Sequence, residues 1–339
     1  MITQLKIRKP DDMHVHLREG DVMREVLQYT GRVFGRALVM PNLSDPIIAG
    51  SGAARYRNNI LRDCEVLQLP FHPLMTIKLT SRTTVDIITR AHSYGVVAVK
   101  LYPEGVTTNS SDGVRDPEQI DPAVFSAMVH SGMVLCVHAE EPGVFSLDRE
   151  QSYLWHVEKI ATAHPDLRIV IEHITTRNGI EFVHKAGSNV AATITVHHLL
   201  ITLDDVIGDK LNPHNFCKPI AKREADRAAL VVAATSGNSK FFLGTDSAPH
   251  TQGAKECASG CAGCFTAPAA IGLLAELFEA HDILQGLEIF TSIHGARFYG
   301  LPLNTEMITL EREAWEIPAT CGSIVPFMAG KKVGWRVAT

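Results

Sequence analysis

The sequence contains no uninterrupted apolar run that approaches the length of a membrane-spanning helix, and basic residues are not in excess. The first absence excludes a helical membrane protein. The net charge of −5 argues against a dedicated nucleic-acid-binding protein, which would carry a basic stripe. The first ten residues, MITQLKIRKP, include no apolar signal-peptide core, so we expect no secretion signal.

Disulfide frameworks and two common catalytic motifs are also missing. The seven cysteines are odd in number and spread over a long chain, which indicates reduced thiols and a cytoplasmic location. Neither GxxxxGKS/T nor GxSxG occurs, so the sequence supports neither P-loop phosphate transfer nor hydrolysis by a serine nucleophile. No linker-like stretch divides the chain, and we predict a single domain over residues 1–339.

The residues that are present, 45% apolar and 20% charged, are typical of a folded globular protein. Short, almost continuously apolar runs alternate with longer segments of helical pattern, as buried parallel strands and their crossover helices do. The predicted strands are Met13–Leu17, Ala37–Met40, Leu74–Leu79, Val96–Leu101, Val134–His138, Ile169–His173, Ala192–Val196 and Phe241–Thr245. The predicted helices include Val22–Tyr29, Thr83–Ser93, Pro117–His130, Ser152–Ala163, Arg177–Lys185, Lys222–Thr235, Pro268–Ala280 and Gly286–Tyr299.

Eight strands that alternate with helices predict an α/β fold with a parallel sheet, because each connection must carry a helix back over the face of the sheet. Eight such units close most simply into a (β/α)8 TIM barrel. A doubly wound open sheet is the alternative, since periodicity alone does not exclude it.

Residues that bind metals gather at the ends of these predicted strands. His14 and His16 form His-x-His in the first strand, where a two-residue step puts both imidazoles on one face. The others follow the carboxyl ends of later strands, at the rim where barrel enzymes build their sites. They are Lys100, His138, His173 and Asp246. Imidazole nitrogen and carboxylate oxygen suit a borderline metal such as zinc, so we predict a metal site at this rim.

Lys100 needs its own explanation within such a site. A protonated ammonium is repelled by divalent cations and offers no lone pair to a metal. Either the side chain is structural, or its amine is carboxylated by CO2 to a carbamate whose two oxygens can bridge two metals.

Motifs in this order resemble the amidohydrolase superfamily and, within it, the compact stand-alone bacterial dihydroorotases. The resemblance runs from Pro10 to Ala270 and again near the C-terminus. The matching stretches are PDDMHVHLREG, RALVMPNL, VKLYPEGVTTNSS, VHAE, EHITT, NFCKPI, LGTDSAPH, CAGCFTAPAA and FYGLP. The most specific are GTDSAPH and CAGCF, whereas His-x-His is shared across the superfamily.

The resemblance implies a zinc-dependent barrel that interconverts N-carbamoyl-L-aspartate and L-dihydroorotate in de novo pyrimidine synthesis, in a cytoplasmic homodimer. His14, His16 and Asp246 would hold one zinc ion. A second would be held by His138 and His173, with carboxylated Lys100 bridging the two. A hydroxide between the metals would act as nucleophile, and Asp246 would serve as general base and acid.

The resemblance also assigns residues that bind the small-molecule substrate. Arg18, Asn42 and His250 match contacts to the substrate carboxylate, and Arg18 lies two residues beyond His16, so we expect it on the same side of the strand. His16 and His138 would border the substrate as well. Backbone groups around Lys218 and Ala262 match those that read the pyrimidine ring. Thr107 and Thr108 match a mobile loop that closes over the substrate.

Some positions depart from the pattern of that family. Glu140 and Glu141 follow His138 where a small residue and a single acid are expected, and His197–His198 stand where one histidine follows glutamine. Lys218 replaces a leucine of some relatives. None of these departures removes a predicted ligand; they bear on substrate affinity.

Three thiols, Cys257, Cys261 and Cys264, lack the paired second knuckle of a zinc ribbon. We therefore assign no metal to them and expect a tight loop over the active site whose thiols pack as small hydrophobic groups.

Two other functions remain open from the sequence. Another cyclic-amide hydrolase, such as a hydantoinase or allantoinase, would share the metal residues. It would need different substrate-binding residues in place of Arg18, Asn42 and His250. A non-catalytic barrel protein would be expected to have lost a metal ligand or the catalytic aspartate, and all are present here.

Overall fold

The computed structural model describes residues 2–107 and 110–338, and its centre is an eight-stranded parallel sheet in which each strand pairs with the next one along the chain. The strands are β2 (Asp11–Val15), β3 (Arg36–Val39), β4 (His72–Lys78), β5 (Val96–Leu101), β6 (Val134–Val137), β7 (Ile169–Ile171), β8 (Val190–Ile194) and β9 (Phe241–Leu243). Nearly every residue in them is buried, which explains their continuous apolar runs.

The sheet curls until its first and last strands meet. A parallel bridge joins Val15 at the end of β2 to Ser247, four residues beyond β9. The amide of His16 donates to the Ser247 carbonyl (3.0 Å), and the amide of Asp246 donates to the His14 carbonyl (2.9 Å). The sheet is thus a barrel, as predicted, and the open doubly wound alternative is wrong.

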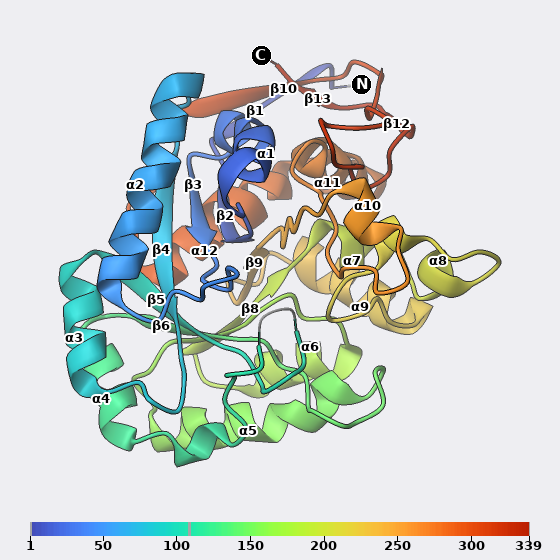
Figure 1. Cartoon of the computed structure of the whole chain (residues 1–339). Helices are drawn as coiled ribbons and strands as arrows, with labels where there is room; N and C mark the ends of the chain where they lie inside the picture. The colour runs from blue at the N-terminus through green and yellow to red at the C-terminus, as the bar shows by residue number, and fades with distance from the viewer. Residues whose placement is uncertain (1, 108–109, 339) are drawn as a thin grey trace.

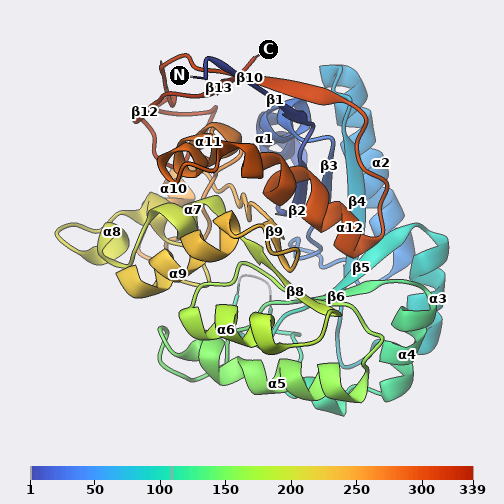
Figure 2. The same ribbon diagram turned by 180° about the vertical axis from the view of Figure 1, so that it is seen from behind.

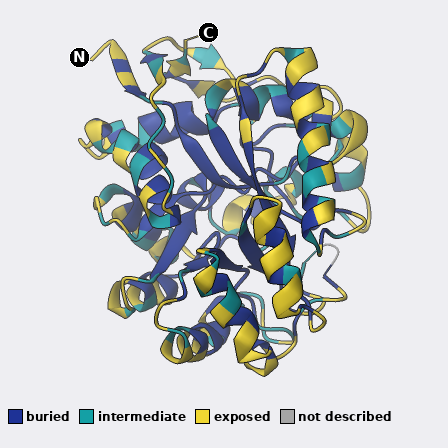
Figure 3. Ribbon diagram, turned by 90° about the vertical axis from the view of Figure 1, so that its left-hand side faces the viewer, coloured by how far each residue is buried: buried dark blue, intermediate teal, exposed yellow. Residues whose placement is uncertain are grey.

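Helices surround the barrel on its outside (Figures 1 and 2). The longer ones are α1 (Gly20–Val33), α2 (Gly50–Leu67), α3 (Val85–Ser93), α4 (Pro122–His130), α5 (Arg149–Ala163), α6 (Arg177–Lys185), α9 (Glu224–Thr235) and α11 (Ala270–Ala280). Shorter helical elements are η1 (Pro117–Gln119), α7 (Val196–Leu200), α8 (Asp204–Ile207), η2 (Pro213–Asn215), α10 (Gln252–Lys255), η3 (Leu284–Gly286), η4 (Ile289–Ile293) and α12 (His294–Tyr299). Figure 3 shows the strands buried and the outward helix faces exposed.

Two helices differ from the sequence prediction for local reasons. The predicted helix Pro117–His130 divides into η1 and α4, because Pro122 occupies the first helical position and the Asp121 carboxylate accepts a hydrogen bond from the Ala123 amide (2.9 Å). The predicted helix Gly286–Tyr299 begins with a π-helical turn, η4, before it continues as α12.

Helix α2 was not predicted, although it is the longest in the described part of the chain. Most of its residues face solvent, and only a narrow stripe is buried. That stripe consists of Gly50, Ala53, Tyr56, Ile60, Asp63 and Cys64. A stripe this narrow, with two glycines in the first turn, gives a weak helical signal in sequence.

Every barrel strand except β5 ends one or two residues earlier than predicted. Strand β2 covers Asp11–Val15 in place of Met13–Leu17, β9 stops at Leu243, and β8 covers Val190–Ile194 because Val196 already begins α7. His14 and His16 therefore also lie at the carboxyl end of their strand, together with the other metal-type residues.

A second, antiparallel sheet holds both ends of the chain at one end of the molecule, with β10 between the first strand and the last (Figure 1). Its strands are β1 (Gln4–Arg8), β10 (Met307–Glu311) and β13 (Arg336–Val337), and a short ribbon pairs β11 (Trp315–Glu316) with β12 (Lys332–Val333). Within residues 2–107 and 110–338, no helix combines the length and apolar character needed to cross a bilayer.

Candidate active site

One cavity at the carboxyl ends of the barrel strands collects most of the residues that the sequence singled out. The predicted residues that line it are His14, His16, Arg18, Asn42, Thr107, His138, His173, Lys218, Asp246 and Ala262, and Tyr102, Ala248 and Gly263 line it as well. Lys100 and His250 lie behind this lining, and Thr108 lies outside the described residues.

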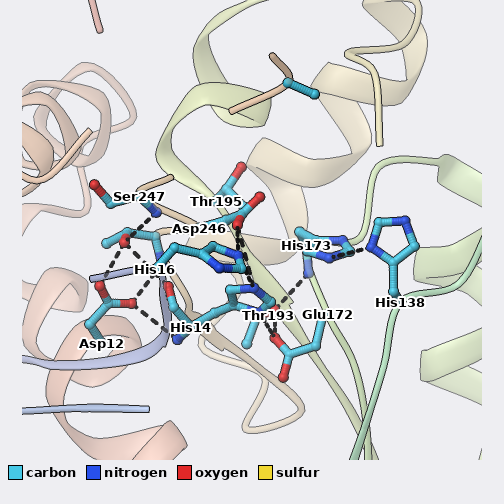
Figure 4. Close-up of polar contacts among 12 residues, drawn as sticks. Asp12, His14, His16, His138, Glu172, His173, Thr193, Thr195, Asp246 and Ser247 are labelled. Atoms are coloured by element: carbon cyan, nitrogen blue, oxygen red, sulfur yellow. Dashed lines mark hydrogen bonds and ion pairs between the residues drawn. The ribbon is translucent and has the colours of Figure 1, made fainter. Parts of the chain in front are cut away.

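The end of β2 and the segment after β9 supply the first cluster of ligand atoms (Figure 4). Nε2 of His14 lies 3.3 Å from Nε2 of His16, and both approach Oδ1 of Asp246, at 3.4 and 3.1 Å. These three side chains bring one ligand atom each within 4.8 Å of the others. Two nitrogens and one carboxylate oxygen converge here, as a divalent metal requires.

A carboxylate from across the barrel fixes which nitrogen of His14 faces this cluster. Oε2 of Glu172, the residue after β7, lies 2.8 Å from Nδ1 of His14 and accepts a hydrogen bond from the Thr193 hydroxyl (2.7 Å; Figure 4). Glu172 thereby leaves Nε2 of His14 free to bind a metal.

The second cluster has the same construction at the ends of β6 and β7. Nδ1 of His138 faces Nε2 of His173 at 3.0 Å, and Nε2 of His138 pairs with Oε2 of Glu140 at 2.7 Å. Glu140, which departs from the family pattern, thus orients His138 from the side opposite His173.

Burial keeps the imidazoles in the form that binds metals. Desolvation lowers the pKa of His16 to about 4, despite its hydrogen bond to Asp246, and also lowers the pKa of His138 and of His173. Burial acts to raise the pKa of Asp246, but the hydrogen bond with His16 and the nearby His14 outweigh it and lower that pKa below its ordinary value. His16, His138 and His173 are therefore neutral in the resting site, and Asp246 is anionic.

Lys100 lies in β5 between the two clusters in sequence, completely buried. Its Nζ has no hydrogen-bond partner within the described ranges and lies 4.8 Å from the ring centroid of Tyr102. Desolvation lowers the pKa of this amine. A buried amine that has no partner and a lowered pKa gives up its proton more readily, as reaction with CO2 requires, so this position suits a carbamate.

The backbone at this rim is strained where the functional side chains emerge. His173 and Asp246 have φ values of 42° and 44°, in the left-handed region that is costly for residues other than glycine. Gly244 is required two residues before Asp246, because a Cβ there would lie 2.8 Å from Thr193 and 3.0 Å from the His14 Cβ.

Asp12 closes the barrel beneath the first cluster. Its carboxylate accepts hydrogen bonds from the His14 amide (3.1 Å) and from the amide and hydroxyl of Thr245 (2.8 and 2.6 Å). Burial raises the pKa of Asp12 to about 7. This residue ties β2 to the segment after β9 and so holds His14 next to Asp246.

The residues predicted to read a carboxylate lie beside the metal-type clusters. Arg18 donates from Nε to the Pro249 carbonyl (2.9 Å), and its Nη2 lies 3.0 Å from Nε2 of His250. The expectation that strand alternation orients Arg18 is wrong, because β2 ends at Val15. Arg18 instead reaches the cavity through a left-handed backbone conformation (φ 62°). Desolvation and the Arg18 charge lower the pKa of His250 to about 3, so Arg18 is the cation of the pair.

A loop that follows β5 covers part of the cavity. Its base is closed by a bridge between Pro103 and Val114, and the Lys218 ammonium donates to the Val106 carbonyl (2.7 Å). Lys78, which is fully buried, forms an ion pair with Asp112 of the same loop. Thr107 lines the cavity, as expected for the predicted lid.

The cysteine loop borders the same cavity through Ala262 and Gly263. Its thiols differ in environment: Cys264 is buried in the core, Cys261 is partly exposed and Cys257 is exposed. The prediction that all three pack as hydrophobic groups is therefore wrong for Cys257, whose Sγ lies in the surface turn near Ser259.

Comparisons with known proteins agree with this geometry. The model of the amidohydrolase family matches residues 11–318. The chain is 49% identical to a dihydroorotase of Aromatoleum aromaticum over 98% of this chain and 99% of that protein, and 48% identical to a dihydroorotase of Photobacterium profundum over 99% and 100%. This chain belongs to the dihydroorotases of the amidohydrolase family.

Solved structures lead to the same group. The dihydroorotase of Campylobacter jejuni superposes with a TM-score of 0.92 at 37% identity and covers 100% of this chain and 99% of its own. That of Saccharomyces cerevisiae, crystallised with 5-fluoroorotic acid, has a TM-score of 0.91 at 34% identity and covers 99% of both chains. An L-hydantoinase of Arthrobacter aurescens shares only the fold, with 16% identity, a TM-score of 0.82, and coverage of 98% and 83%.

Sequence reasoning missed the residues that support the ligands. Asp12 and Glu172 stand next to predicted ligands in DDMHVH and EHIT, but adjacency along a strand does not reveal that Glu172 reaches His14. The signal available was an acid beside each histidine motif, which carboxylate–histidine–metal arrangements commonly use.

Proposed function

We propose that this chain catalyses the reversible cyclisation of N-carbamoyl-L-aspartate to L-dihydroorotate plus water, the third step of de novo pyrimidine synthesis. The observation that carries this proposal is a single cavity in which Arg18 lies beside two clusters of metal-type ligands. N-carbamoyl-L-aspartate and L-dihydroorotate both carry an α-carboxylate. A guanidinium can bind a carboxylate through two parallel hydrogen bonds.

The two clusters of donor atoms in the cavity suit two zinc ions. His14, His16 and Asp246 would hold one, and His138 and His173 the other, with carboxylated Lys100 as the ligand common to both. The support is the pairing of buried imidazoles with orienting carboxylates and the unpartnered amine of Lys100. Zinc bound here would supply Lewis-acid activation of a water and of the amide carbonyl.

Asp246 is placed to carry the proton of the reaction. Its carboxylate is anionic in the resting site and faces the cavity. In ring opening it would accept a proton from the attacking water and donate it to the ring nitrogen as the C–N bond breaks; in ring closure the same transfers run in reverse.

The substrate would be oriented by residues beside the two clusters. Arg18 would bind the α-carboxylate, with Asn42 and the neutral His250 adding hydrogen bonds. Backbone groups near Lys218 and Ala262 would read the amide edge of the ring, and the loop that carries Thr107 and Thr108 would close over it, which would exclude water.

We further propose that the protein works as a homodimer in the cytoplasm. All seven cysteines are free, which agrees with a reducing compartment. The homodimer rests on the family resemblance, and light scattering on the purified protein measures it directly.

A comparison of substrates tests the proposed function. We expect rapid hydrolysis of L-dihydroorotate and little hydrolysis of hydantoin, which lacks the α-carboxylate. In an Arg18→Gln variant, KM for dihydroorotate should rise about 10- to 100-fold, because a charge-assisted hydrogen bond contributes about 1.5–3 kcal/mol. A preference of the wild-type protein for hydantoin would overturn the proposal and favour the hydantoinase alternative.

A further inference from the structure

A second cluster of metal-ligand side chains is buried outside the catalytic cavity. His197 and His198 lie on α7, and Cys217 follows η2. Each of the three offers one ligand atom within 4.8 Å of the other two. His197 and Cys217 are completely buried, and His198 is 2% exposed.

His197 is the unexplained member of this cluster. Neither of its ring nitrogens has a hydrogen-bond partner in the part of the chain that the structure describes. A buried polar nitrogen without a partner costs about 1–3 kcal/mol, so such a group in a native protein usually faces a water or an ion. In His197, both ring nitrogens lack such a partner among the described residues.

The other two members face each other at a shared acceptor. Cys217 Sγ lies 3.5 Å from Nε2 of His198, and both atoms lie near the Pro219 carbonyl, at 3.2 and 2.9 Å. Nδ1 of His198 lies 2.8 Å from the Thr195 hydroxyl oxygen. Both groups donate to the Pro219 carbonyl, so a cation bound here would replace these two hydrogen bonds: the imidazole proton would move to Nδ1, where the Thr195 hydroxyl can accept it, and Nε2 and the Cys217 thiolate would face the ion.

We propose that His197, His198 and Cys217 bind a zinc-like divalent cation at a site separate from the catalytic centre. Two imidazoles and one thiolate are donors that zinc favours over the harder magnesium and calcium. Three protein ligands leave the fourth position of a tetrahedral zinc site to a water molecule. Binding releases the thiol proton to solvent, and the ion becomes the partner of the Cys217 thiolate and of one ring nitrogen of His197.

The position of this site links it to the wall of the active site. An ion there joins α7 to the segment that contains Cys217, and the next residue, Lys218, lines the catalytic cavity and contacts the loop at Val106. The ion therefore stabilises the folded protein and holds one wall of the cavity in place.

Cobalt(II) titration of the full chain tests the proposal with a signal that the catalytic centre does not give. A thiolate ligand produces an intense near-ultraviolet sulfur-to-cobalt charge-transfer band, whereas the catalytic ligands proposed above are all nitrogen and oxygen. We expect the wild-type protein to show this band and to bind one more equivalent of cobalt than the Cys217→Ser variant, which should lack the band. The variant Cys257→Ser, which alters an exposed thiol, should keep both the band and the equivalent.

A second variant keeps the test valid if Cys217→Ser does not fold. His197→Gln leaves the thiol in place and should weaken cobalt binding at the band-producing site at least tenfold. The proposal is overturned if the wild-type protein shows no such band, if the band persists unchanged in Cys217→Ser, or if His197→Gln binds cobalt with unchanged affinity.

Discussion

At the scale of single residues, the site depends on which ring nitrogen each histidine presents. Glu172 holds Nδ1 of His14 and Glu140 holds Nε2 of His138, so the opposite nitrogens face the cavity. The spacing of His14 and His16 could be interpreted from sequence, because a period of two is a property of any strand. The tautomers could not, because the carboxylate that selects the tautomer of His14 comes from another strand.

Removal of the Glu172 charge tests this orienting role. In Glu172→Gln we expect zinc affinity to fall about 10- to 100-fold, because the amide holds His14 less firmly and makes it less basic. Competition with a metal chelator measures this affinity. The matched variant Glu181→Gln, at an exposed position on α6, should bind zinc as the wild-type protein does; equal affinities in the two variants would contradict the role of Glu172.

Asp246 provides the sharpest residue-level prediction for catalysis. Asp246→Ala removes a ligand and the proton carrier together, so kcat should fall by at least about 10²–10⁴-fold, the range attributed to general acid–base catalysis. The barrel should persist, as circular dichroism and thermal melting would show. Near-normal turnover in this variant would remove Asp246 from the proton transfer.

At the scale of elements, the site is a property of strand ends. The histidines that follow β6 and β7 lie together, as predicted from sequence, because the carboxyl ends of parallel strands share one rim. The left-handed turns at His173 and Asp246 could not be predicted, since no glycine or asparagine marks them.

The loop after β5 yields a prediction at this scale. Lys218→Leu removes the hydrogen bond to Val106 and should increase KM for dihydroorotate several-fold while metal content stays unchanged, because the loop loses one contact that holds it over the cavity. Steady-state kinetics with metal analysis measures both. The exposed Lys210→Leu serves as control, and an unchanged KM in Lys218→Leu would show that this contact is dispensable for substrate binding.

At the scale of the whole molecule, the barrel could be predicted from the sequence, whereas the terminal sheet could not. The barrel follows from eight local βα units, whereas β1 pairs with β10 across about 300 residues, between Gln4 and Glu311 for example. Pairing over such a separation leaves no local pattern. Trp335 anchors this region: it is completely buried, its indole donates to Glu279 (3.1 Å), and its carbonyl accepts from the Trp315 indole (2.9 Å).

Trp335→Ala should therefore destabilise the protein by about 3–5 kcal/mol, as expected for loss of a fully buried aromatic side chain. The folded fraction should keep its activity, because Trp335 does not line the catalytic cavity. Urea unfolding measures the loss. Phe145→Ala, at a side chain that is 66% exposed, should stay within about 0.5 kcal/mol of the wild-type protein; an equal loss in both variants would contradict the anchoring role.

Hydrolysis of dihydroorotate in this cavity is expected to depend on metals held by its histidines. The most direct measurement removes metal from the purified protein with a chelator, restores it with zinc, and follows ring opening of L-dihydroorotate and zinc content on the same samples. We predict that activity falls to background as zinc is removed and returns as zinc is restored. Undiminished turnover in a sample shown to be free of metal would contradict this dependence on metal.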